Sequence, residues 1–275
     1  MGKNKKRIKE VLRYVILIAL SIVVIFPILW MCSTAFKTRV DIFAMPPVWL
    51  LKPVMSNYYR VFVKDFFLRY YINSLIVSAL AVSFALLVGI PCGYGLSRFE
   101  FKHKEDLAFW ILSTRMAPPV FVIIPFFILW RRLGLTDTYV GLAILYALLN
   151  LGLVVWLMRA FFDGIPKELE EVALLDGCSR LQALLKIVLP LCKPGLMAAG
   201  LFSFIMCWNE FLFALVLTSG NMRTAPVAVS GYITFRGINW GPMAAAGTLI
   251  ILPVLIIALL GQKSLVRGFM QGAIR

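Results

Sequence analysis

Residues 14–36 read YVILIALSIVVIFPILWMCSTAF, a run of 23 residues without a charged side chain. A helix needs about 20 consecutive apolar residues to cross the hydrocarbon core of a bilayer. The run is also longer than the roughly 7 to 15 apolar residues of a signal-peptide core. It therefore predicts an uncleaved first transmembrane helix.

Five further stretches are long and apolar enough to span a membrane, and these cover residues 70–97, 107–130, 138–158, 194–218 and 237–262. Two of them are irregular, because Arg115 and Pro118-Pro119 interrupt the third span and Glu210 lies inside the fifth. Charged residues make up 15% of the whole chain, against about 25% in typical soluble domains. The sequence predicts an all-α membrane protein with six transmembrane helices.

The distribution of basic residues predicts the orientation of these spans. With a cytoplasmic N-terminus, the inner segments hold 17 Lys and Arg and the outer segments hold 10. Both termini are therefore expected inside, and the net charge of +15 indicates topology and contact with membrane lipid, with no nucleic acid as a partner. The predicted organisation is a cytoplasmic basic tail (1–13), a first helix (14–36), an external loop (37–69), a five-helix core (70–262) with an inner loop (159–193), and a cytoplasmic tail (263–275).

The inner loop predicts a short amphipathic helix. Pro166 suits a first helical turn, and acidic residues favour the N-terminus of a helix, where the sequence places Glu168, Glu170 and Glu171. An apolar stripe follows at helical spacing, formed by Leu169, Val172 and Ala173. The helix should end at Asp176-Gly177, because glycine tolerates a left-handed turn.

A second short helix is expected after this turn. Ser179 suits its N-cap, and its apolar positions are Leu181, Leu184, Leu185 and Val188. Pro190 and Pro194 interrupt the chain beyond it. Amphipathicity alone favours a pair of interfacial helices resting on lipid headgroups.

The detailed sequence of the loop indicates a more specific function. It reads Glu171-Val172-Ala173-Leu174-Leu175-Asp176-Gly177, and then Ile187-Val188-Leu189-Pro190-Leu191-Cys192-Lys193-Pro194. This pattern resembles the permease subunits of bacterial binding-protein-dependent ABC importers, whose inner loop carries E-A-A-x-x-x-D-G followed by L-P-x-x-x-P. Further stretches resemble the carbohydrate-uptake, MalG-like branch, among them Tyr94-Gly95-Leu96-Ser97-Arg98, Gly134-Leu135-Thr136-Asp137-Thr138 and Trp208-Asn209-Glu210.

The resemblance implies a type I ABC importer permease fold in the bacterial inner membrane. Its inner loop would be a coupling helix that inserts into a cleft on a separate ATP-binding subunit. The coupling residues implied in this chain are Leu169, Glu171, Val172, Ala173, Asp176, Gly177 and Pro190. The implied partners are a second permease subunit in a heterodimer, a dimer of ATP-binding subunits and an extracytoplasmic solute-binding protein. The solute would be a sugar, an oligosaccharide, a polyol or a derivative.

Catalytic motifs are missing from the sequence. The nearest approach to a phosphate-binding G-x-x-x-x-G-K-[ST] loop, Gly261-Gln262-Lys263-Ser264, lacks the first glycine and the G-K pair. We therefore expect ATP and Mg²⁺ to be bound by the partner ATPase, with no cofactor and no catalytic residue in this chain. A single histidine, His103, and five scattered cysteines without a C-x-x-C pair predict no metal site.

Three polar residues within the predicted spans are candidates for the translocation path: Arg115, Asn209 and Glu210. A charge at the bilayer centre costs at least about 2.5 to 3.5 kcal/mol on insertion scales, so Arg115 and Glu210 should face protein or water. The alternative for Arg115 is hydrogen bonding to carbonyls freed by Pro118-Pro119. The alternative for Glu210 is helix packing.

Two other functional classes are alternatives to an ABC importer permease: a secondary carrier and a membrane enzyme. A secondary carrier working alone would show an internal inverted repeat of spans, and the two halves do not match. A polytopic membrane enzyme would need paired Asp residues, a Ser-His dyad or a metal cluster within the spans. The sequence has none of these.

Overall fold

The computed structural model describes residues 2–49 and 52–273. The predicted tails and external loop include Met1, Leu50, Leu51, Ile274 and Arg275, which lie outside the described residues. The chain divides into two compact units. The first consists of the residues up to Phe67 together with Val229–Ile251, and the second consists of Leu68–Ala228 together with the chain from Leu252 onward.

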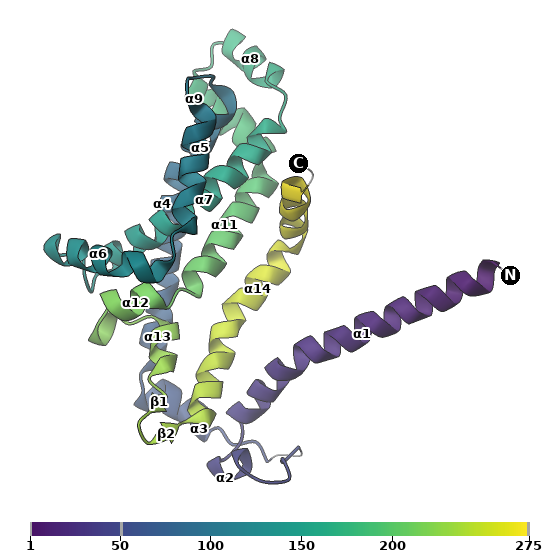
Figure 1. The fold of residues 1–275 in the computed structure, drawn as a ribbon, viewed down its shortest axis with the longest axis vertical. Coiled ribbons are helices and arrows are strands. Elements are labelled where there is room, and N and C mark those ends of the chain that lie inside the picture. The colour runs from purple at the N-terminus through teal and green to yellow at the C-terminus, as the bar shows by residue number, and fades with distance from the viewer. Residues whose placement is uncertain (1, 50–51, 274–275) are drawn as a thin grey trace. The chain divides into compact units, whose positions relative to one another are not determined.

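Helices form most of both units, as Figure 1 shows. The first unit contains α1 (Gly2–Ala35), α2 (Arg39–Ile42), α3 (Ser56–Tyr59), a π-helical turn (Arg60–Lys64), the strands β1 (Ile233–Thr234) and β2 (Gly237–Ile238), and the start of α14 (Trp240–Ala273). The two strands form an antiparallel hairpin in which Ile233 faces Ile238.

The second unit contains the remaining elements. These are α4 (Phe67–Arg98), α5 (Lys104–Ser113), a 3₁₀ turn (Thr114–Met116), α6 (Pro119–Arg132), α7 (Tyr139–Asp163), α8 (Glu168–Leu175), α9 (Arg180–Ala183), a π-helical turn (Leu184–Val188), α10 (Leu189–Leu191), α11 (Lys193–Trp208), α12 (Leu212–Leu217), a 3₁₀ turn (Gly220–Met222), α13 (Ala225–Ser230) and the remainder of α14.

The predicted fold class is confirmed. Within residues 2–49 and 52–273, four helices are long and apolar enough to cross a membrane: α1, α4, α7 and α14. Two bent helix pairs raise the number of candidate spans to six, if each pair is one span. The bends are 94° between Lys104–Met116 and α6, and 82° between Arg180–Leu191 and α11.

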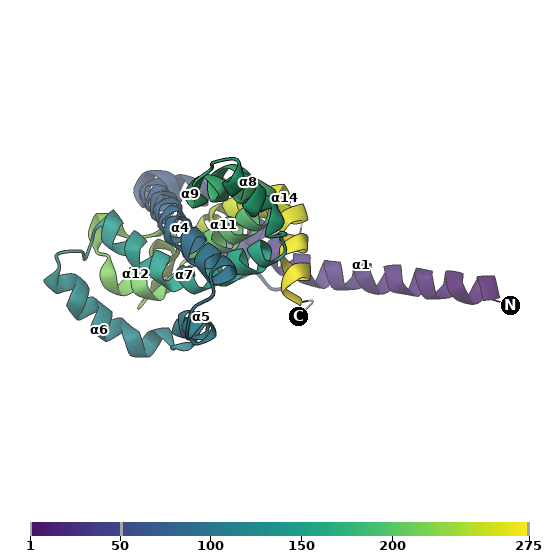
Figure 2. The ribbon, with the colours of Figure 1, turned by 90° about the horizontal axis from the view of Figure 1, so that it is seen from above.

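Helix α7 lies at the centre of the second unit, with 56% of its most apolar window buried. Small residues allow its neighbours to approach closely. On α4, a Cβ atom added to Gly93 would lie 3.0 Å from the carbonyl oxygen of Val155 on α7. On α11, a Cβ atom added to Gly195 would lie 2.3 Å from the ring of Phe161 on α7. Figures 1 and 2 both show α4 and α11 beside α7.

The irregularity expected in the third and fifth spans is present. Pro118 adopts an extended backbone and Pro119 begins α6, so the chain changes direction between α5 and α6. The predicted fifth span, 194–218, is not one helix: α11 ends at Trp208 and α12 begins at Leu212. The break coincides with Glu210, whose carboxylate caps the first turn of α12.

The predicted external loop is folded within the first unit. The side-chain amide of Asn57 donates to the carbonyl oxygens of Ala35 and Lys37, both at 2.9 Å. Helix α1 begins at Gly2, so the described part of the predicted tail 1–13 is helical. None of the most apolar window of Lys9–Ala35 is buried within this chain. The point at which this helix enters the membrane remains a prediction.

Candidate functional site

The segment between α7 and α11 contains the loop whose sequence predicts a coupling function. Helix α8 begins at Glu168, two residues after Pro166, with Lys167 as its N-cap. It ends at Leu175, with Asp176 as its C-cap residue, and Gly177 follows with a φ of +87°. The amide of Cys178 then donates to the carbonyl oxygen of Ala173 at 3.0 Å. The left-handed glycine therefore closes α8 and redirects the chain toward α9.

A capping box starts α9, as the position of Ser179 predicted. The hydroxyl of Ser179 accepts from the amide of Gln182 at 3.3 Å, and the side chain of Gln182 accepts from the amide of Ser179 at 2.8 Å. These reciprocal bonds satisfy two amides that the helix itself leaves unpaired. The turn between α8 and α9 is thus fixed at both sides.

The structure divides the predicted apolar stripe between two faces of α8. Ala173 is buried, with 3% of its surface exposed. Leu169, Val172 and Leu175 are 44%, 57% and 87% exposed. Beyond the turn, Leu181 and Leu185 are also exposed. Contiguous exposed apolar side chains indicate a surface for protein or membrane interaction.

A buried glutamate holds the opposite side of α8. Glu170 forms an ion pair with Arg98 at the end of α4, and the exposed fractions of these side chains are only 8% and 5%. The hydroxyl of Tyr94 donates to the second carboxylate oxygen of Glu170 at 2.7 Å. A guanidinium nitrogen of Arg98 also donates to the carbonyl oxygen of Ile165, at 3.1 Å. We call Tyr94, Arg98 and Glu170 the α8 anchor.

The sequence alone does not reveal this anchor. Tyr94 and Arg98 are four residues apart, so they lie on one face of α4. Their stretch contributed only to the family resemblance. Three glutamates stand in the first turn of α8, and a sequence pattern cannot tell which of them turns inward.

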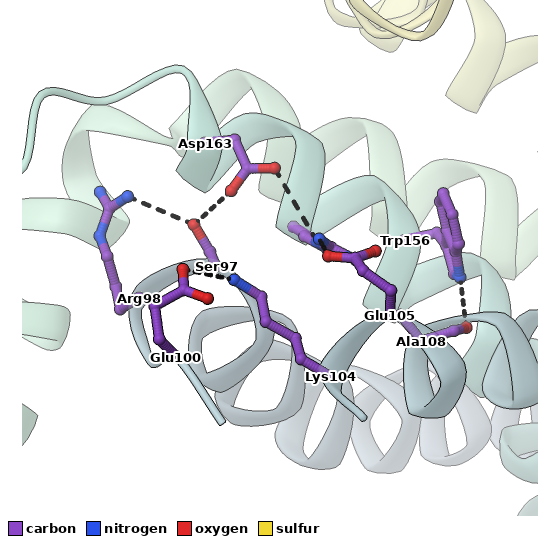
Figure 3. A network of polar contacts seen from close by, with 9 residues as sticks. Ser97, Arg98, Glu100, Lys104, Glu105, Ala108, Trp156 and Asp163 are labelled. Atoms are coloured by element: carbon purple, nitrogen blue, oxygen red, sulfur yellow. Dashed lines mark hydrogen bonds and ion pairs between the residues drawn. The ribbon is translucent and has the colours of Figure 1, made fainter. Parts of the chain in front are cut away.

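A second set of polar contacts joins the ends of α4, α7 and α5, as Figure 3 shows. The hydroxyl of Ser97 donates to Asp163 at 2.6 Å and accepts from Arg98 at 3.2 Å. Arg159, on α7, pairs with Asp163 at 3.9 Å and with both carboxylate oxygens of Glu105 on α5. These contacts start next to Arg98, so they continue from the α8 anchor.

The other predicted coupling residues lie around the turn. Glu171 is exposed on α8, Asp176 is its exposed C-cap residue, and Pro190 lies in α10. Five of the predicted coupling residues are thus exposed in α8 or directly after it: Leu169, Glu171, Val172, Asp176 and Gly177. Ala173 is buried, and Pro190 is exposed in α10, beyond the turn.

Arg115, Asn209 and Glu210 lie at two different helix breaks. The Cγ and Cδ atoms of Arg115 would each lie 3.3 Å from a Cβ atom added to Gly152. The carboxylate of Glu210 accepts from the amides of Phe213 and Ala214 at 2.9 and 3.1 Å. The side chain of Asn209 donates to the carbonyl oxygen of Ile205 at 2.8 Å. Glu210 thus satisfies amides that a helix start within a membrane would otherwise leave unpaired.

A comparison with known protein families shows which family contains this chain. Residues 85–271, which include the α8 anchor residues and the whole loop, match the family described as binding-protein-dependent transport system inner membrane component. The chain belongs to this family. It is therefore a multi-pass permease component of the inner membrane, and the resemblance seen in its sequence is confirmed.

Two characterised permeases are similar to this family member along nearly their whole length. The diacetylchitobiose uptake system permease protein DasC of Streptomyces coelicolor is 34% identical, over 94% of each chain. The trehalose/maltose transport system permease protein MalG of Thermococcus litoralis is 33% identical, over 97% of this chain and 99% of that protein.

A solved structure shares the fold of this permease component. A chain in the crystal structure of a bacterial ABC transporter, involved in the import of the acidic polysaccharide alginate, is 26% identical. The match has a TM-score of 0.78 and covers 94% of this chain and 97% of the other.

Proposed function

We propose that this permease component forms half of the translocation path of an ABC importer for a sugar or sugar-like solute: a sugar, an oligosaccharide, a polyol or a derivative. The observation that carries the proposal is α8, a short helix that presents Leu169 and Val172 outward while Glu170 holds its inner side. A helix fixed in this way can transmit force from a docked partner. The names of the related permeases support a carbohydrate as the solute.

The partner that docks on α8 is an ATP-binding subunit. Leu169 and Val172 enter its cleft, Glu171 makes polar contacts at the rim, and Asp176 and Gly177 set the angle of the turn. Ala173 supports the loop from the buried side of α8, and Pro190, exposed in α10, belongs to the same coupling segment. ATP and Mg²⁺ are bound by a dimer of that subunit, and this chain provides no catalytic residue, metal ligand or cofactor site.

A second permease subunit completes the path in a heterodimer, and an extracytoplasmic solute-binding protein delivers the solute. Helix α1 supports this assembly, because its most apolar window has no residue buried in its own chain and needs a partner or lipid to cover it. Arg115, Asn209 and Glu210 belong to the membrane-embedded polar positions of this half. Glu210 acts there by capping α12.

Dependence on partners is the first prediction. The isolated chain, reconstituted in liposomes, should neither hydrolyse ATP nor accumulate sugar, because it lacks a nucleotide-binding motif. Both activities should appear when the second permease, the ATP-binding subunit and the solute-loaded binding protein are added. Sugar accumulation by the isolated chain would instead identify a secondary carrier.

Orientation is the second prediction, and it rests on the 17 inner against 10 outer basic residues. Both termini and the α8–α9 loop should face the cytoplasm. A reporter fused after Arg180 should be cytoplasmic, and a reporter fused after Lys52 should be external. Reversed labelling of the two fusions would reject this topology.

A further inference from the structure

Arg98 joins α8 to the end of α4 through more than one contact. Its guanidinium pairs with the carboxylate of Glu170 and donates to the carbonyl oxygen of Ile165, which precedes α8. Tyr94, one helical turn earlier on α4, donates to the other oxygen of Glu170. Both carboxylate oxygens of Glu170 are therefore paired, and α4 contacts both α8 and the segment that precedes it.

Helix α8 is joined to its neighbours in the chain by two short connections. The connection from α7 consists of residues 164–167, and the connection to α9 consists of 176–179 around the left-handed Gly177. Since neither connection leads directly to α4, a force applied to the outer face of α8 reaches α4 directly only through contacts between side chains. The α8 anchor is a contact of this kind.

Burial makes the anchor costly to separate. The two charged side chains are 5% and 8% exposed, so separating them would leave an unpaired charge in a dry environment. Sliding by about 1 Å or more would also stretch the 2.7 Å bond from Tyr94 beyond the usual hydrogen-bond range. The anchor therefore resists displacement of α8 from α4.

The α8 anchor is also connected to α5 and α7 through side-chain contacts. Ser97 links Arg98 to Asp163 (Figure 3). Arg159 in turn links Asp163 to Glu105 on α5. Helix α5 is held on α7 by a further bond, from the indole of Trp156 to the carbonyl oxygen of Ala108 at 2.9 Å. Displacement of α8 is thus passed to the ends of α4, α7 and α5 together.

We propose that Arg98 and Glu170 are positioning residues that lock α8 to the end of α4, so that movement of the ATP-binding subunit reaches the membrane spans. This inference rests on the proposed docking of the ATP-binding subunit on α8. It adds a requirement that docking alone does not impose: an importer with a broken lock should bind its ATPase and still fail to couple hydrolysis to transport.

The test uses the complete reconstituted importer with the variants Glu170→Gln, Arg98→Gln and the double substitution. Glutamine keeps the volume of Glu170 and removes its charge. The matched control is Glu100→Gln, which removes the charge of a glutamate that is 78% exposed and pairs with Lys104 at 3.0 Å. Three quantities are measured: the amount of ATPase that co-purifies, ATP hydrolysis without binding protein, and the stimulation of hydrolysis by solute-loaded binding protein.

We expect normal co-purification and basal hydrolysis in every variant. Stimulation and uptake should fall roughly ten-fold or more in Glu170→Gln and Arg98→Gln, within the range of allosteric coupling. The double variant should be no worse than either single variant, because the two residues act as one unit. Glu100→Gln should match the wild type.

Tyr94→Phe keeps the ion pair and removes one hydrogen bond, so it tests the lock even if a charge-deleting variant does not fold. Its stimulation should fall roughly ten-fold, the effect expected for loss of a hydrogen bond to a charged group. Unchanged stimulation in Tyr94→Phe and in any charge-deleting variant that folds would overturn the lock, as would a loss of stimulation that only follows a loss of bound ATPase. Failure of the proposed function is recognised separately, because the wild-type chain would then not co-purify an ATPase.

Discussion

The variant Gly177→Leu is expected to insert into the membrane and pair with its partner permease, but to lose transport and hold the ATP-binding subunit weakly. Gly177 has a φ of +87°, and a non-glycine residue in the left-handed region costs about 1–2 kcal/mol. A Cβ atom here would meet no other atom within 4 Å. The expected effect therefore comes from backbone strain that changes the angle between α8 and α9, with no clash inside the chain.

The matched control is Gly177→Asn, because asparagine enters the left-handed region more readily than leucine. It should retain most of the uptake. The measurements are pull-down of the ATPase and binding-protein-stimulated ATP hydrolysis in the reconstituted complex. Equal loss in the two variants would show that the turn is not limited by backbone conformation.

Asp176→Lys tests docking at the same turn by a different physical route. A cation at the C-terminus of a helix is stabilising by about 0.3–1 kcal/mol, so α8 itself should not be weakened. Loss of ATPase binding would then report contact with the partner. Full stimulation and normal uptake in both Gly177→Leu and Asp176→Lys would mean that the loop is only an interfacial helix pair.

The variant Gly195→Ala should lower the thermal stability of the assembled importer. The added Cβ atom would lie 2.3 Å from the ring of Phe161, a buried residue of α7, so the α7–α11 contact must open. Overpacking of this kind typically costs about 1–3 kcal/mol. The measurement is the midpoint of thermal unfolding of the purified complex in detergent.

Gly200→Ala provides the control on the same helix. Its Cβ atom would lie 3.8 Å from Leu86, an ordinary contact, and alanine favours a helix interior by about 1 kcal/mol over glycine. Its midpoint should equal or exceed that of the wild type. Equal midpoints for Gly195→Ala and Gly200→Ala would contradict the close approach of α7 and α11.

The sequence by itself determined the features that follow from local chemistry. Runs without charge identified the spans, because an apolar helix of that length has no stable place in water. Pro118-Pro119 identified the break between α5 and α6. In the same way, Gly177 identified the left-handed turn and Ser179 identified the start of α9. Each depends on the backbone preferences of one or two residues, which are the same in any fold.

The tertiary structure alone decided which residues of α8 turn inward. Apolar periodicity grouped Ala173 with Leu169 and Val172, yet Ala173 is buried beside Glu170 while the other two are exposed. A buried carboxylate is stable only if a partner neutralises it and fills its hydrogen bonds. That partner, Arg98, stands 72 residues earlier in the chain and meets Glu170 only because α4, α7 and α8 pack together. No pattern within the loop could contain that information.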